Sequence, residues 1–168
     1  MLLPEGVAIA HPDKLFIGGR WVAANSNRSI ELVSPDTELV VGAVAEADEV
    51  DMDAAVAAAR DAFDNGPWPS LSPAERIAAF RRMVDHLRGR QDELARAWTA
   101  QIGGLSSFAG PMHMGAVMTL DGIAGFAENF RFVEHRPATG AAVGLIVHEP
   151  VGVVAAIAPW NGPFGIMA

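Results

Sequence analysis

The sequence contains no cysteine, and several common catalytic signatures are missing with it. Without cysteine, the 168 residues can form no disulfide bond, no thiolate metal site and no cysteine nucleophile. No GxGxxG or GxxxxGK(S/T) phosphate-binding loop occurs, and no serine lies in a GxSxG setting, although this leaves a serine nucleophile open. The histidines, which show no spacing typical of metal ligands, are His11, His86, His113, His135 and His148.

The sequence also lacks an excess of positive charge. Its 12 lysine and arginine residues are outnumbered by 20 aspartate and glutamate residues, which gives a net charge of −8 and a pI near 5.0. An acidic protein repels phosphate backbones, so nucleic acid is not expected as a partner. The single basic cluster lies on a predicted helix and is interrupted by acids, which favours a solvated face over a binding patch. It consists of Arg76, Arg81, Arg82, Arg88 and Arg90.

Neither a signal peptide nor an uninterrupted membrane span can be recognised. Residues 1–13 lack the basic stretch that begins a signal peptide, so we expect a cytoplasmic protein. Residues 151–168 carry no charge and reach the lower length of a membrane-spanning helix. Pro159, Asn161, Gly162 and Pro163 interrupt this run, which fits a buried strand and a turn better.

The composition is globular, with 51% hydrophobic residues, and the first part of the chain is predicted to form short strands. Strands at 14–17 and 20–22 flank Gly18-Gly19, and two glycines favour a two-residue hairpin turn because both adopt positive φ. A second pair of strands is predicted at 29–33 and 40–45.

Helices are predicted next. The first covers 48–64 with Asp48 as its N-cap. The second has the clearest start signal, a capping box of Ser72 and Glu75 with Pro73 at the first helical position.

Gly89 is predicted to break that second helix, so that a separate helix covers 91–102 and ends at Gly103-Gly104. A long helix with few charges is predicted over 111–132. The apolar stripes that should form the core are Val56, Ala59, Ala62 and Phe63 in the first helix, Ile77, Phe80, Met83 or Val84, and Leu87 in the second, and Met112, Ala116, Ile123, Phe126 and Phe130 in the last.

The periodicity changes after Pro137, where strands are predicted at 141–148 and 151–158. The second is apolar on both faces, which is typical of a strand buried in a parallel sheet. Parallel neighbours require crossover connections, and no later strand follows to supply them. The sequence therefore predicts an α/β fold that is incomplete as given.

The segment EPVGVVAAIAPWNGPF, residues 149–164, is the best candidate site. In open α/β sheets, ligands bind beyond the carboxyl ends of the strands. Asn161 follows such an end, and its side-chain N–H could donate to a developing oxyanion. The residues alone favour a plainer interpretation, a strand and an Asn-Gly turn with Trp160 as a core anchor.

The same segment closely resembles the Pro-Trp-Asn segment of the aldehyde dehydrogenase family. Other stretches resemble the family in the same order: Phe16–Trp21 its opening hairpin, 33–36 and 44–48 its next strands, 50–69 its first helix and tryptophan turn, and Leu71–Arg76 the start of its second helix. Each stretch is weak alone, but the ordered set is very specific. The chain thus looks like the first third of a family member.

This resemblance implies oxidation of a small-molecule aldehyde to a carboxylic acid, with hydride transfer to NAD or NADP. In the family a cysteine attacks the carbonyl, and a glutamate helps water to release the acid. The asparagine that matches Asn161 supplies the oxyanion-hole side chain. The backbone that matches Ile157, Ala158, Pro159 and Trp160 lines the cofactor cleft.

The resemblance also divides the chain into three parts. Residues 1–135 would be N-terminal strands and helices of the Rossmann-like cofactor-binding domain. Residues 136–150 are similar to the hairpin that builds the family's oligomer, which implies a homo-oligomer. Residues 151–168 would be the first buried strand and the Pro-Trp-Asn turn of the cofactor-binding core.

Departures from the family pattern limit what this chain can do. The family's catalytic cysteine, general-base glutamate, ribose-contacting lysine and Gly-rich phosphate turn lie downstream of Pro-Trp-Asn, and none occurs here. Residues 101–105 stand where many members have an acid and Gly-Lys-Pro. An oxyanion donor without a nucleophile stabilises a charge that never forms, so we expect the chain alone to be inactive.

Two other hypotheses stay open. A non-catalytic relative could dock on full-length subunits through an exposed strand edge at 141–148. An independent helical binding module is a weaker hypothesis, because residues 151–168 would leave a large apolar surface in water.

Overall fold

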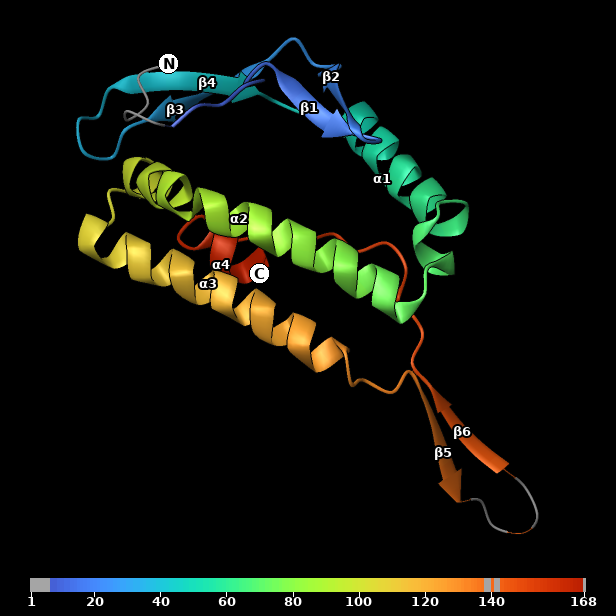
Figure 1. Ribbon diagram of the computed structural model, residues 1–168. Helices are drawn as coiled ribbons and strands as arrows, with labels where there is room; N and C mark the ends of the chain where they lie inside the picture. Colours follow the sequence, from blue (N-terminus) through green and yellow to red (C-terminus); the bar gives the residue numbers. More distant parts are fainter. Residues whose placement is uncertain (1–6, 138–139, 141–142, 168) are drawn as a thin grey trace.

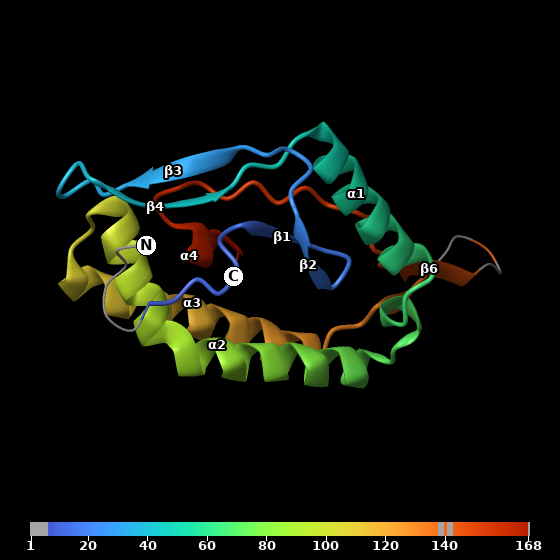
Figure 2. The same ribbon diagram turned by 90° about the horizontal axis from the view of Figure 1, so that it is seen from above.

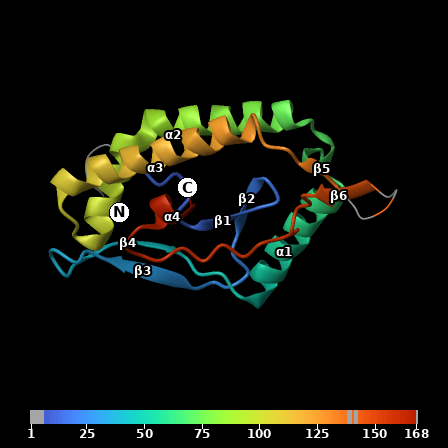
Figure 3. The same ribbon diagram turned by 90° about the horizontal axis from the view of Figure 1, so that it is seen from below.

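The computed structural model describes residues 7–137, 140 and 143–167, which include three two-stranded antiparallel sheets and two long helices packed together (Figure 1). In chain order the elements are β1 (Lys14–Ile17), β2 (Arg20–Ala23), β3 (Ser29–Val33), β4 (Val40–Ala45), α1 (Glu49–Asp64), the short 3-10 helix η1 (Trp68–Ser70), α2 (Pro73–Ile102), α3 (Ser106–Ala127), β5 (Val133–Pro137), β6 (Val143–Val147) and α4 (Pro163–Met167). The α2–α3 pair lies along one side, β3–β4 and α1 lie along the other, and α4 lies between them (Figures 2 and 3).

Both N-terminal hairpins are confirmed. β1 pairs with β2 through a turn at Gly18 and Gly19, whose φ angles of 60° and 76° lie in the left-handed region that glycine adopts most easily. β3 pairs with β4, and the register shifts between Leu32 and Val33. These two sheets precede α1 and leave their outer faces exposed.

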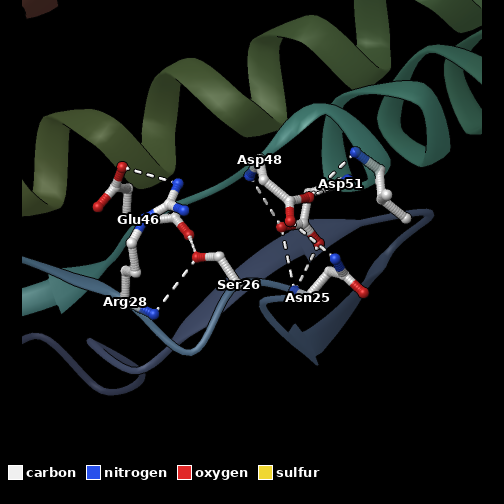
Figure 4. A network of polar contacts seen from close by, with 7 residues as sticks. Asn25, Ser26, Arg28, Glu46, Asp48 and Asp51 are labelled. Carbon is white, nitrogen blue, oxygen red and sulfur yellow. Dashed lines mark hydrogen bonds and ion pairs between the residues drawn. The ribbon is translucent and has the colours of Figure 1, made fainter.

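A polar network joins the segment after β2 to the start of α1 (Figure 4). Asp48 caps the helix as predicted: its carboxylate accepts from the backbone N–H groups of Val50 and Asp51 at 3.0 and 3.2 Å. Asp51 is 7% exposed and accepts from the backbone N–H of Asn25 at 3.0 Å. The Asn25 side-chain amide donates to Asp48 at 2.7 Å, which lowers the pKa of the Asp48 carboxyl. The network therefore fixes where α1 begins relative to the first hairpin.

The predicted apolar stripe of α1 is not buried. Val56 is 50% exposed, Ala59 and Ala62 are also exposed, and only Phe63 is half-buried. A stripe is buried only where another element packs on it, and α1 makes few contacts within the described residues.

One continuous helix, α2, spans residues 73–102, so the predicted break at Gly89 is wrong. The capping box of Ser72 and Glu75 is confirmed, and so is the helix end at Gly103, which has a left-handed φ of 68°. A glycine inside a helix costs about 0.5–1 kcal/mol, and α2 packs against α3 on both sides of Gly89. This tertiary packing outweighs the local preference.

The boundaries of α3 also differ from the prediction, since it covers 106–127 instead of 111–132. Its N-cap, Leu105, makes no side-chain cap, so the start carries no sequence signal. Pro111 lies inside the helix. The predicted stripe is confirmed at Met112 and Ala116, which lie in the core, but it is wrong at Ile123 and Phe126, which are 45% and 68% exposed. The buried face consists of Ala109, His113, Ala116, Val117, Leu120 and Ala124. Apolar residues cover most of this helix, so no single stripe stands out.

Two clusters between α2 and α3 form the core. One contains Val84, Val117 and Leu120, with Phe80, Leu87 and Phe164 packed against it; the other contains Ala95, Trp98 and Ala109, with Ile102 and Met112 packed against it. Salt bridges Arg88–Asp121 and Arg81–Glu128 also join the helices, with side chains that stay largely exposed. The basic cluster therefore forms a solvated face, as predicted, and its exposed ion pairs stabilise the fold only slightly.

The β5–β6 hairpin projects away from the helices (Figure 1). It begins at Val133, three residues before the predicted start at 136, because β5 forms a strand that the sequence did not predict. The predicted strand at 141–148 corresponds to β6, residues 143–147. Residues 141–142 lie outside the described residues.

No strand forms at 151–158, contrary to the prediction. This segment has no regular secondary structure, and Val151 and Ile157 are 90% and 92% exposed. A strand needs a hydrogen-bonding neighbour, and the described part of the chain offers none beside it. Within the same residues, no helix is long and apolar enough to cross a bilayer.

Candidate functional site

The Pro-Trp-Asn turn lies between the irregular segment 151–158 and α4. Trp160 and Asn161 form a turn, and the backbone N–H of Ile166 donates to the Gly162 carbonyl at 3.2 Å in the first turn of α4. The indole N–H of Trp98, from α2, donates to the main-chain carbonyl of Asn161 at 2.9 Å. The turn is therefore attached to the helical core by a contact between residues far apart in sequence.

A second contact attaches α4 to α3. The ring of Phe164 stacks on the ring of His113, with centroids 5.4 Å apart and planes 10° apart. His113 is 2% exposed, and its Nδ1 lies 2.8 Å from the Ala109 carbonyl. Because a carbonyl only accepts, Nδ1 carries the proton. His113 thus serves in helix packing, as predicted, and no cluster of metal-ligating side chains occurs in the described residues.

Trp98 is closely enclosed. It is 8% exposed, and its ring lies edge-on to His113 with centroids 6.3 Å apart. A side chain at Gly104 would overlap the six-membered ring of Trp98, so the chain reversal after α2 packs closely against the indole. The indole therefore has little freedom to move away from Asn161.

The predicted site residues have different environments in the structure. The main-chain carbonyl of Asn161 accepts the hydrogen bond from Trp98, whereas its side chain is exposed. Ile157 and Trp160 are 92% and 77% exposed, Pro159 is exposed and Ala158 is half-buried. Trp160 is therefore not the core anchor that the plainer interpretation predicted.

Sequence reasoning missed the two residues that attach the turn, Trp98 and Phe164. Trp98 lies fourteen positions after Val84 on the same helix, so the buried stripe of the second helix would have reached it had the break at Gly89 not been assumed. Phe164 follows the turn and carried no pattern of its own.

Asn161 is exposed and is not enclosed in a groove of the described residues. A groove of about 710 Å³ lies elsewhere, between α1 and the segment after β6, and is lined by Phe63, Trp68, Phe132 and Val154 among others. None of residues 157–161 lines it. Chemically, the turn offers an amide donor on a firmly held backbone and no nucleophile.

Comparison with known proteins identifies this architecture. The model of the aldehyde dehydrogenase family matches residues 21–168. Geranial dehydrogenase of Castellaniella defragrans is 36% identical over 90% of this chain and 32% of its own length. The NADP/NAD-dependent aldehyde dehydrogenase PuuC of Escherichia coli is 34% identical over 95% of this chain and 32% of its own length.

Solved structures of aldehyde dehydrogenases have a similar fold over most of this chain, which again matches about a third of their length. The Mycobacterium tuberculosis aldehyde dehydrogenase complexed with NAD+ has a TM-score of 0.83 at 42% identity, over 92% of this chain and 32% of that one. A mutant of aldehyde dehydrogenase C from Pseudomonas syringae, complexed with NAD+ and octanal, has a TM-score of 0.85 at 34% identity, over 96% of this chain and 32% of that one.

The chain spans about a third of the length of these relatives, and its helices and small antiparallel sheets form a portion of their fold. Its family match covers most of the described residues and includes the Pro-Trp-Asn turn. The resemblance expected from the sequence is confirmed, and the chain belongs to the aldehyde dehydrogenase family.

Proposed function

We propose that this chain supplies the oxyanion donor and one wall of the cofactor site of an NAD(P)-dependent enzyme that oxidises aldehydes to carboxylic acids. The observation that carries the proposal is the turn at Asn161, whose main chain is held by Trp98 while its side chain stays exposed. Family membership and relatives described as complexes with NAD+ support this reaction class.

Asn161 would act on the aldehyde oxygen. When a nucleophile attacks the carbonyl carbon, negative charge develops on that oxygen, and the Asn161 side-chain N–H can donate to it. The nucleophile that the family resemblance implies is a cysteine, and the sequence has none, so we propose that it comes from outside these residues. The chain alone is therefore proposed to be inactive.

The residues before Asn161 fit one wall of a dinucleotide site. Ile157 and Trp160 are 92% and 77% exposed, so they present apolar surface on which a cofactor ring can lie. The backbone of Ala158 and Pro159 lies between them. When bound, the nicotinamide supplies the hydride acceptor. We propose that residues 151–168 form the first strand and turn of a Rossmann-like core, to which residues 1–135 contribute strands and helices.

Enzyme assays of the chain alone and of a completed enzyme test this function. In the completed enzyme, residues 1–168 replace the matching segment of the Mycobacterium tuberculosis aldehyde dehydrogenase, the 42% identical relative. With octanal as the probe aldehyde, we expect no NADH from the chain alone and steady NADH formation from the completed enzyme. The unaltered relative is the control. Turnover by the chain alone, or a completed enzyme that binds NAD but makes no NADH, would contradict the proposal.

We also propose that residues 136–150 join two copies of this chain in a homo-oligomer. In the β5–β6 register, Val133 pairs with Val147 and His135 with Leu145, so both pairs lie on one face of the hairpin. This face is largely apolar, and Val143, Leu145 and Val147 are 74%, 54% and 52% exposed. A projecting apolar face of this kind marks an interaction surface.

Sedimentation of completed-enzyme variants tests the oligomer. We expect Leu145→Glu to shift the completed enzyme to smaller species, because a carboxylate on the apolar face opposes its burial. Ile146→Glu, one residue away on the opposite face, should leave the assembly unchanged. Equal behaviour of the two variants would refute this interface. If the chain alone co-purifies with a full-length dehydrogenase while the completed enzyme is inactive, the non-catalytic partner becomes the better hypothesis.

A further inference from the structure

We propose that Trp98 is a positioning residue for Asn161: its indole N–H holds the Asn161 main chain, so that the side-chain amide keeps one orientation. This inference rests on the proposed function of Asn161 as the oxyanion donor. It adds a residue from the middle of the sequence to a site that was otherwise defined by one short segment.

The contact itself is well formed and enclosed. The distance of 2.9 Å between the Trp98 Nε1 and the Asn161 carbonyl oxygen is typical of an N–H···O hydrogen bond, and 63 positions separate the two residues. Trp98 is 8% exposed, whereas Trp21, Trp68 and Trp160 are 48%, 50% and 77% exposed. Of the four tryptophans, Trp98 is thus the one whose indole is buried. Its single N–H donates to the main-chain carbonyl of Asn161.

The indole is held firmly from several sides. It belongs to the cluster with Ala95 and Ala109 between α2 and α3, and the backbone at Gly104 approaches its ring so closely that no side chain would fit. After the turn, Phe164 stacks on His113, whose ring lies next to that of Trp98. Residues 161 and 164 are therefore attached to the same pair of helices, three positions apart.

The position of the Asn161 main chain matters because the side chain has few bonds between Cα and the donating nitrogen. A shift or rotation of the backbone moves the amide by a similar amount, and oxyanion donors act only within hydrogen-bonding distance of the developing charge. Trp98→Phe keeps an aromatic ring in the cluster but removes the N–H, so the partly buried Asn161 carbonyl loses this partner. The turn is then free to shift.

Nuclear magnetic resonance of the 168-residue chain tests the contact. We expect one of the four indole N–H signals to exchange with solvent at least about tenfold more slowly than the others, and Trp98→Phe to remove it. Trp98→Phe should also shift the Asn161 side-chain amide signals, whereas the matched variant Trp21→Phe should not. A Trp98 indole that exchanges as fast as the other three would overturn the inference.

Kinetics of the completed enzyme test the consequence. We expect Trp98→Phe to lower kcat about tenfold, below the roughly 10²-fold loss that a misplacement of about 1 Å can cause. The KM values for NAD and aldehyde should change little, because the donor acts in the transition state. In the Asn161→Ala background, Trp98→Phe should have no further effect on kcat, since nothing is left to position.

These experiments distinguish a failure of the proposed function from a failure of the positioning role alone. An inactive parent completed enzyme refutes the proposed function and, with it, a positioning role. An active parent in which Trp98→Phe matches wild type, or lowers kcat equally with and without Asn161, refutes the inference alone, because a merely structural tryptophan would act on both backgrounds.

Discussion

In the completed enzyme, replacing Asn161 with alanine is expected to lower kcat by about 10²–10³-fold while KM for NAD stays nearly unchanged. The reason lies in when the proposed contact forms: an oxyanion donor interacts only weakly with the neutral aldehyde oxygen and strongly once that oxygen carries charge. The main chain at Asn161 is held by Trp98 and does not depend on the side-chain amide, so the turn should keep its shape.

Two further variants make this expectation specific. Asn161→Asp has nearly the same shape but brings negative charge toward the oxyanion, so its kcat should fall at least as far as that of Asn161→Ala. Asn129→Ala, an exposed asparagine between α3 and β5, should behave as wild type. If Asn161→Ala retains most of the wild-type kcat in steady-state assays, Asn161 is not the oxyanion donor.

Much of this fold could be predicted where the signals are local. The turn at Gly18-Gly19, the N-cap at Asp48 and the capping box at Ser72 depend only on neighbouring residues, and the structure confirms all three. Such signals follow from backbone geometry and from N–H groups that a nearby side chain satisfies. Element boundaries of this kind can therefore be deduced from a single sequence.

The predictions for α2 and α3 are wrong where contacts between residues far apart in sequence determine the structure. Gly89 predicts a helix break locally, but contacts with α3 on both sides keep α2 continuous. For α3 the difficulty is different: its apolar residues surround the helix, so periodicity could not identify the face that contacts α2. Only the position of the partner helix distinguishes the buried residues.

The candidate site was predicted in part for the same reason. The Pro-Trp-Asn string pointed to Asn161 through family resemblance, whereas the residues that hold it, Trp98 and Phe164, required knowledge of the helix pair. Residues 151–158 read as a buried strand, yet they are exposed here because a strand depends on neighbours that the described residues do not contain. The sequence pattern shows that a segment can form a strand, but a strand forms only where a neighbouring strand is present to pair with it.

Val84→Asp is expected to unfold the α2–α3 pair. Val84 is fully buried and packs against Val117 and Leu120, with Phe164 beside them. A carboxylate there has no partner and costs several kcal/mol, which is a large share of the roughly 5–15 kcal/mol that stabilises a typical domain. Far-ultraviolet circular dichroism of the 168-residue chain should show a marked loss of helix, with lower soluble yield.

Met83→Asp is the matched control, because the sequence alone could not decide which of these two neighbours faces the core. Met83 is 44% exposed, so its replacement should cost less than about 1 kcal/mol, mainly through helix propensity. Equal loss of helix in both variants would mean that the packing of α2 on α3 is wrong. Because Phe164 packs on the Val84 cluster, Val84→Asp should also release the turn at Asn161, seen as faster exchange of the Trp98 indole N–H, whereas Met83→Asp should leave that exchange slow. The same core that stabilises the helices would then be shown to hold the candidate site.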